Sequence, residues 1–541
     1  MVIELFKANK NHKQDNLLDT SLWMNPKIQE KLQKSWAPIF YEHVFCKIDE
    51  EPFAVLYGKT GKPNFPVNIL LSLEYIKHMK DCSDLELLDD FYFDYLVNYA
   101  VGIRTLGEMN LAERTLYYFR ERVYRHCLEN PKDEDLLFDP FIALLNNFKE
   151  TAGISLEEQR TDTTLFMSNI KKAGRISLAY DVLAKAVKAI PEEERTGTLA
   201  QVLEPDFKTD VLYRAKAQEG ETKLRLLLGL CQEALQILQA QPEDLDEVRI
   251  LKRFLSEQSI LDPESGQPVP KPKKEISSSS LQSAHDEDAT YRKKGHVGQS
   301  GYSLEISETC SKGNAFQVIT DYSIEPNIIS DVEILKDRMG SIQSTGCTDL
   351  YVDGGFHSPD IHQAAKENDI KIHLTNMSGT EPTKKLPVSE FEIDEATNVI
   401  EKCPAGHAPT HAGVKSGQTT AHFSHDACAN CELKNKCYSK KQVKSCVVRI
   451  SLKSVETCRE RVRMKASKKE NTSKRAGVEG SNSALKRKGL DKLRVRGQAK
   501  SSVVCGLKVT AQNIKRFIKY MQGGYKPKEN QQQGVPVPIY G

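Results

Sequence analysis

Three carboxylates occupy positions that suit the binding of divalent metal ions. Asp162 lies in RTDTTLFMSNI, where a short run of Thr and apolar residues predicts a strand that delivers one acid to its end. Asp353 ends a second apolar strand in LYVDGGFHS, before a Gly-Gly turn, and Glu479 lies on a basic helix in SKRAGVEGSNSALKRKGL. Because oxygen-rich sites suit Mg²⁺ and Mn²⁺, a site built from these three acids would favour one of these ions.

The helix around Glu479 also carries polar residues that fit phosphate binding. At about 100° per residue, these residues share one helix face with it: Arg475, Asn482 and Lys486. Arg and Lys side chains can hold phosphate oxygens while the glutamate binds a metal ion. The same spacing fits an exposed helix with Glu–Lys ion pairs, and spacing alone favours that second interpretation.

Four cysteines predict a structural zinc site. Cys428 and Cys431 form a CxxC pair, Cys437 follows six residues later, and Cys403 precedes them in KCPAGH. Four thiolates suit tetrahedral Zn²⁺ and leave no open position for catalysis. Nearby histidines are possible replacements for one cysteine: His407, His411, His422 and His425. The alternative is a set of unligated thiols in a loop.

The composition indicates a multidomain globular protein with one strongly basic segment. A chain of 541 residues is too long for one core, so we expect about two to four domains. Net charge is only +2, but residues 459–500 hold fifteen Lys or Arg against four Asp or Glu. This excess suggests a polyanionic partner. A solvated, partly disordered linker is the alternative for the part up to Lys474.

No segment of the sequence predicts a membrane span or a signal peptide. There is no run of about 18 apolar residues, and the first residues, MVIELFKANKNHKQ, lack an apolar core. Most of the 13 cysteines are scattered singly, as is usual in a reducing compartment. We therefore expect a cytoplasmic protein.

Apolar spacing predicts the elements that would position these residues. Residues 20–130 and about 170–260 are predicted to be helical, and a Pro- and Ser-rich stretch near 262–280 to be a mobile linker. After Gly301 the order strand, strand, helix, strand, helix, strand, together with the Asp162 strand, predicts a mixed sheet with helices against its faces. The last predicted helix has four apolar residues on one side, expected to pack on this sheet: Leu507, Ile514, Phe517 and Ile518.

The ordered motifs resemble those of the DDE transposases of bacterial insertion sequences. RAGVEGSNSALK resembles their Y-x2-R-x3-E-x6-K signature, with Thr472 at the tyrosine position. TDTT and LYVDGGFHSPD are similar to the strands that carry their first and second acids. HDEDATYRKKGHVGQSGYSLEI is similar to their D-x-D-A…GY stretch, with Asp286 and Asp288 at its acidic positions. The helical segment upstream resembles their N-terminal domain, and the cysteine cluster resembles an insertion found in one branch of the group.

This resemblance implies an α/β protein with a ribonuclease-H-like mixed sheet and helices on both faces. The implied domains are as follows: an N-terminal helical domain for DNA-end binding at 1–150, a catalytic core at 155–380 with a helical insertion at about 170–285, a zinc-knuckle insertion at 381–460, a basic C-terminal part of the core at 461–525 and a disordered tail at 526–541.

The resemblance also implies a function. Asp162, Asp353 and Glu479 would bind two Mg²⁺ or Mn²⁺ ions and catalyse DNA cleavage and strand transfer, by phosphodiester hydrolysis and transesterification. Arg475, Lys486 and Asn482 would contact DNA. The partners would be double-stranded transposon ends and target DNA, bound by a homodimer of a nucleoid-associated bacterial protein.

Other functions remain open. One is an inactive or domesticated transposase that binds DNA without cleaving it, which the Thr472 departure allows. A second is a zinc-ribbon DNA-binding protein whose acids are ordinary surface residues. A third is a structure-specific nuclease of the same fold, which would hydrolyse DNA without joining ends.

Overall fold

The computed structural model describes residues 6–14, 16–58, 63–130, 136–171, 173–213, 219–239, 245–377 and 384–524. The tail 526–541, predicted to be disordered, lies outside these residues. The chain forms two compact units: unit 1 comprises Met1–Gly346 and Val478–Gly541, and unit 2 comprises Cys347–Gly477. Among the described residues, no helix is long and apolar enough to cross a bilayer.

The N-terminal part of unit 1 is helical, as predicted. Its helices are α1 (Pro26–Gln33), α2 (Trp36–His43), α3 (Val67–Lys80), α4 (Asp84–Phe93), α5 (Tyr95–Ala100), α6 (Glu113–Glu129) and α7 (Phe138–Ala152). Asn25 caps α1, and Ser83 with Glu86 forms a capping box at α4. These helices bury one apolar cluster, which includes Phe40, Phe53 and other large side chains.

A long central strand organises the sheet of unit 1. Strand β5 (Val297–Thr309) pairs antiparallel with β1 (Glu158–Phe166), β4 (Thr290–Lys294) and β6 (Ile319–Pro326). Asp162 on β1 lies opposite Ile306 on β5. The helix α12 (Asp331–Ser344) follows β6. The predicted strand around Asp162 and the pair of strands after Gly301 are therefore present. Asp162 lies in the middle of β1, however, so the prediction that it stands at the end of its strand is wrong.

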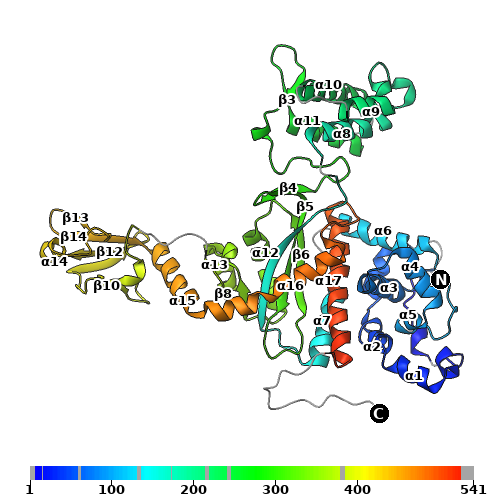
Figure 1. The fold of residues 1–541 in the computed structure, drawn as a ribbon, viewed down its shortest axis with the longest axis horizontal. Helices are drawn as coiled ribbons and strands as arrows, with labels where there is room; N and C mark the ends of the chain where they lie inside the picture. Colours follow the sequence, from blue (N-terminus) through cyan, green and yellow to red (C-terminus); the bar gives the residue numbers. More distant parts are fainter. Residues whose placement is uncertain are drawn as a thin grey trace. The chain divides into compact units, whose positions relative to one another are not determined.

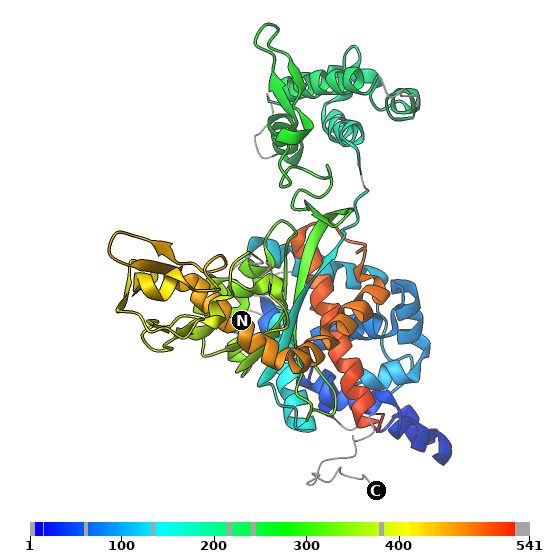
Figure 2. The ribbon, with the colours of Figure 1, turned by 60° about the vertical axis from the view of Figure 1, so that its left-hand side comes forward.

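The last helix, α17 (Gln498–Met521), packs on both sides. Cys505 and Val509 join the apolar core of the sheet, but the four predicted residues of the sheet-facing side pack among the N-terminal helices: Leu507, Ile514, Phe517 and Ile518. The predicted packing of this helix on the sheet is therefore confirmed, but residues other than those four make the contact. Helix α17 contacts both α3 and β6 and runs between them in Figure 1, and Figure 2 shows the same helix from another side. A helix buried on both sides has no single apolar face from which its partner can be predicted.

The helical insertion of unit 1 has a core of its own. Helices α8 (Arg175–Ala189), α9 (Pro205–Leu212), α10 (Gly220–Leu238) and α11 (Asp246–Gln258) bury a separate apolar cluster. The segment predicted to be a mobile linker instead begins within a short hairpin of β2 (Ser259–Leu261) and β3 (Pro268–Pro270). Gly266, with φ of 67°, provides the left-handed turn that allows the two strands to pair.

Unit 2 contains a parallel strand pair and a small antiparallel sheet. Strands β7 (Asp349–Val352) and β8 (Lys371–Leu374) are parallel, with α13 (Pro359–Glu367) between them in sequence. The cysteine-rich part forms a sheet in the order β11 (His411–Lys415), β12 (Gln418–Phe423), β14 (Cys446–Ser451) and β13 (Lys440–Lys441), and β9 (Glu392–Ile393) pairs with β10 (Ile400–Lys402). Helix α15 (Leu452–Arg475) ends this unit. The chain is thus a mixed α/β protein with antiparallel and parallel strands.

Candidate active site

Asp162 lies on the side of β1 that faces helix α16 (Gly477–Leu485). Because strand side chains alternate between faces, Asp162 and Arg160 share a face with their partners on β5, Ile306 and Glu308. Ile306 belongs to the same buried cluster as two residues of α16, Val478 and Leu485. The burial of these apolar side chains therefore places α16 over the half-buried Asp162.

A polar contact links Asp162 directly to α16. Asn482 is 7% exposed, and its Nδ2 donates a hydrogen bond to Oδ2 of Asp162 over 3.4 Å. Glu479 is exposed and precedes Asn482 by three residues, so the two side chains are neighbours on the helix surface. The structure therefore brings together the strand with the first predicted acid and the helix with the third.

A fully buried glutamate fixes α16 against the strands. Glu308 on β5 accepts a hydrogen bond from Ser481 Oγ of α16 at 2.5 Å and contacts Arg516 Nη1 of α17 at 3.2 Å. Its other oxygen, Oε1, lies 2.8 Å from Nη2 of Arg160 on β1. Glu308 thus connects β1, α16 and α17 at a position next to Asp162, and we regard it as a positioning residue.

A second buried acid lies on the opposite face of β5. Oε1 of Glu305 accepts a hydrogen bond from Thr161 Oγ1 at 2.9 Å, and its side chain is shielded from solvent. Burial, together with the negative charge of Asp321, raises the pKa of Glu305 to about 8. Asp321 is itself paired with Arg338 of α12. Glu305 is therefore mostly protonated at neutral pH and acts as a neutral hydrogen-bonding group.

In unit 2, Asp353 follows directly after strand β7. Its Oδ1 accepts a hydrogen bond from the backbone N–H of Gly355 at 2.8 Å, which fixes the short turn after the strand. Its Oδ2 lies 3.6 Å from Nη2 of Arg475, the last residue of α15. The neighbouring Lys474 donates to the hydroxyl of Tyr351 on β7 at 2.8 Å, and this contact holds the end of α15 against the strand. Arg475, predicted to contact phosphate, therefore lies beside the second acid.

The polar residues around Glu479 do not share one continuous helix, and this prediction is wrong. Helix α15 ends at Arg475, α16 spans Gly477–Leu485, and the following turn has a left-handed residue, Gly489, with φ of 79°. Glycine has a low helix propensity and readily adopts the left-handed conformation, which explains the non-helical backbone at Gly489. Lys486 falls in that last turn, 3.5 Å from Asp491.

The two further acids of the motif pattern support the surrounding structure. Asp286 is buried and accepts a hydrogen bond from the hydroxyl of Tyr302 at 2.6 Å. Oδ2 of Asp288 accepts one from the backbone N–H of Gln498, the first residue of α17, at 3.1 Å. Both side chains therefore tie the segment before β4 to neighbouring elements.

The four predicted zinc ligands surround one small cavity in unit 2. Cys403, Cys428, Cys431 and Cys437 line a cavity of about 20 Å³ together with His407. Burial and the neighbouring Cys403 and Cys431 thiols raise the pKa of Cys437. Among the described residues, no three of these sulfur atoms lie within 4.8 Å of one another. The cysteines are thus gathered around one space, at separations wider than those of a zinc-bound set.

Sequence patterns did not reveal the two buried glutamates. The only signal in SLEISET is the presence of Glu305 and Glu308 in a segment otherwise predicted to be a strand. A charged residue that is buried in a strand must be paired or protonated. The partners, Arg160 and Thr161, are evident only from the register of β1 against β5.

Comparison with known families gives one result. Residues 402–518 match a family model described as Transposase DDE domain. No curated protein and no solved structure gave a match. The matched range contains Arg475, Glu479 and Asn482, whereas Asp162 and Asp353 precede it. Domains of this kind generally use divalent metals and act on DNA. The match supports a DDE transposase family for this chain, and with it an enzyme of the nuclease and transposase class.

Proposed function

We propose that this protein is a transposase that binds the ends of an insertion sequence and catalyses DNA cleavage and strand transfer. The observation that carries the proposal is the contact of Asn482 with Asp162, which joins the strand of the first acid to the helix of Glu479. The family match over residues 402–518 supports the same reaction class independently of that contact.

The donor atoms fit two Mg²⁺ or Mn²⁺ ions. Asp162, Asp353 and Glu479 would hold them, and carboxylate oxygens are the ligands that these ions prefer. Oδ1 of Asn482 is buried without a hydrogen-bond partner among the described residues, so this amide oxygen is also available beside Asp162. When bound, such ions activate an attacking water or 3′-hydroxyl and stabilise the leaving oxygen.

The chain's own residues would position the DNA and the acids. Glu308 holds α16, the helix that bears Glu479, so that Asn482 stays in contact with Asp162. Arg475 neutralises Asp353 in the structure and would turn to a phosphate when DNA binds. Lys486 and the basic residues of 459–500 would add further phosphate contacts, so binding should weaken steeply with salt. We assign recognition of the DNA ends to the N-terminal helices and expect a homodimer on DNA.

A strand-transfer assay with end-bearing DNA and Mg²⁺ tests this function. Asp162→Asn, Asp353→Asn and Glu479→Gln should each lower activity by more than about 100-fold, because loss of supporting residues around a metal already costs about 10–100-fold. DNA binding in a gel-shift assay should persist in all three variants. Asp360→Asn, which changes an exposed acid of α13, serves as the control and should remain active.

The outcomes separate the proposal from its alternatives. Wild-type protein that binds DNA ends but never nicks them with Mg²⁺ or Mn²⁺ would favour a non-cleaving, transposase-derived DNA-binding protein. Nicking without any joined product would favour a nuclease. Equal activity in the three acid variants and the wild type would exclude these carboxylates from the reaction.

A further inference from the structure

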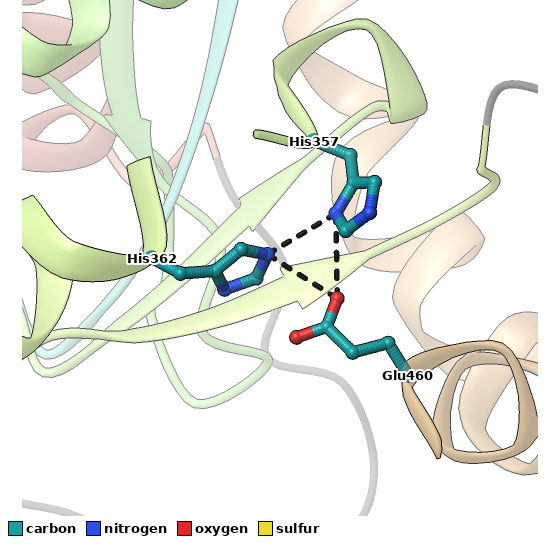
Figure 3. Close-up of side chains that lie close together, drawn as sticks. All are labelled: His357, His362 and Glu460. Atoms are coloured by element: carbon teal, nitrogen blue, oxygen red, sulfur yellow. Dashed lines mark hydrogen bonds and ion pairs between the residues drawn. The ribbon is translucent and has the colours of Figure 1, made fainter. Parts of the chain in front are cut away.

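Two histidines and one glutamate, none of them among the acids and cysteines discussed above, converge in unit 2. His357 follows the short turn η9 (Gly354–Phe356), His362 lies on α13 and Glu460 lies on α15. Figure 3 shows the three side chains directed toward one another. Nδ1 of His357 lies 3.1 Å from Nε2 of His362, and Oε2 of Glu460 lies 3.3 Å and 3.2 Å from these two nitrogens.

Hydrogen bonds alone cannot satisfy all three atoms in this triangle. If both imidazoles donate to Glu460, their two N–H groups approach each other at a nitrogen separation of 3.1 Å. If one imidazole donates to the other, its proton is not available for the carboxylate. Oε2 of Glu460 is shielded from solvent and has no hydrogen-bond partner of good geometry among the described residues. A cation at the centre would instead be bound by a lone pair of each atom.

The dimensions of the triangle match those of a metal site. For metal–ligand distances of about 2.0–2.1 Å, two ligands of a tetrahedral Zn²⁺ ion are separated by about 3.3–3.4 Å. The observed separations of 3.1, 3.2 and 3.3 Å are close to one face of that tetrahedron. The side chains of His357, His362 and Glu460 are 19%, 32% and 15% exposed, so an ion can enter and water can fill the fourth position.

We propose that His357, His362 and Glu460 bind one divalent transition-metal ion, with Zn²⁺ as the best-suited ion. Two imidazoles and one carboxylate form a ligand set that zinc uses, whereas Mg²⁺ and Ca²⁺ prefer oxygen ligands throughout. The site shares no residue with the proposed Mg²⁺ ligands or with the four cysteines. It would therefore bind its own transition-metal ion, separate from the Mg²⁺ or Mn²⁺ ions proposed for the three acids.

The position of the site indicates what the ion would stabilise. His357 comes four residues after Asp353, and Glu460 lies on the same helix as Arg475, which contacts Asp353. An ion bound to His357 and Glu460 would fasten the segment after β7 to α15. It would thus hold both members of the Asp353–Arg475 pair in one arrangement, and the three ligands act as positioning residues.

Metal counting on the full-length protein tests the proposal. The protein is saturated with Zn²⁺, desalted and measured by mass spectrometry for zinc per chain. His362→Ala and Glu460→Gln should each bind one ion fewer than the wild type. His296→Ala, which changes an exposed histidine between β4 and β5, should bind as many as the wild type. The variant Cys431→Ser separates this site from the cysteine site. It should still bind one ion, and the double variant Cys431→Ser/His362→Ala should lose that ion.

A second readout keeps the test valid if a variant loses stability. Zn²⁺ should raise the melting temperature of the wild type relative to protein treated with EDTA, and this rise should be smaller in Glu460→Gln, which preserves the size of the side chain. Circular dichroism establishes that each variant is folded. Zinc content and metal-induced stabilisation that are the same in wild type, His362→Ala and Glu460→Gln would overturn the proposal, as would complete loss of zinc in Cys431→Ser alone.

Discussion

Glu308 is the residue on which we expect the position of α16 to depend most. It is fully buried on β5 and touches three elements at once, through Arg160, Ser481 and Arg516. The substitution Glu308→Gln preserves the size of the side chain but removes the negative charge that both guanidinium groups contact. We expect α16 to detach from β1 and β5 more often. Strand transfer should then fall, because Asn482 and Glu479 would lose their fixed position.

The expected loss of stability follows from the burial of the ion pairs that Glu308 makes with Arg160 and Arg516. Removing one partner of a buried ion pair costs about 3–5 kcal/mol. The side chains of Arg160 and Arg516 are 10% and 20% exposed, so water can partly solvate them and the lower end of that range applies. A cost of about 3 kcal/mol corresponds to roughly 100-fold more frequent opening of the helix.

Hydrogen exchange measured by mass spectrometry reports this opening locally. Amides of 477–485 should exchange about 100-fold faster in Glu308→Gln than in the wild type. Amides of α10, in the separately packed insertion, should be unaffected. A local measurement is needed because a chain with several cores does not unfold in one step.

Glu305→Gln is the matched control for this substitution. It changes a glutamate on the same strand that is equally buried but is mostly protonated at neutral pH, since its pKa is raised to about 8. Gln closely resembles that neutral acid, so exchange in α16 should not become faster than in the wild type. Equal acceleration of α16 exchange in the two variants would refute the role assigned to the Glu308 ion pairs.

Two further predictions concern pH and metal binding. In the folded protein the pKa of Glu305 is about 8, above its ordinary value of 4.5, so the wild type should lose stability as the pH rises from 4.5 to 8. Glu305→Gln should remove this loss and should be about 3 kcal/mol more stable than the wild type at pH 7. Urea unfolding of unit 1 at pH 5 and pH 8 checks the sign. Asn482→Ala removes the hydrogen bond to Asp162 and should lower strand transfer by about 10–100-fold, with partial recovery at high Mg²⁺ concentration. No effect at any Mg²⁺ concentration would exclude a supporting role for Asn482.

Local patterns were sufficient to predict much of the secondary structure. The strand that contains Asp162, the strand that ends before Asp353 and the N-terminal helices are predictable because alternation, helical spacing and capping residues act over a few neighbouring positions. The helix that bears Glu479 is predicted at the correct place but with the wrong extent, because helical spacing does not take account of the low helix propensity of Gly477 and Gly489.

Features that depend on distant pairing could not be predicted in the same way. Helix α17 is buried around most of its surface and buries polar as well as apolar side chains, so its sequence does not indicate which side meets the sheet and which meets the N-terminal helices. The contact between His357 and Glu460 cannot be predicted from local sequence, because these residues are far apart in the chain and only the fold of unit 2 brings them together. Neither histidine spacing nor charge pattern in the sequence singles out that group.

The buried charges near Asp162 help to explain why the strands pair in one register. A slip of one residue between β1 and β5 would turn Asp162 away from α16 and separate Arg160 from Glu308. The separated charges would both be buried without their partner, a state that costs several kcal/mol. On the other face, the bond between Thr161 and Glu305 would be broken by the same slip. Charged residues inside a sheet are costly, but here their pairing favours the one register that directs Asp162 toward the helix bearing Glu479 and Asn482.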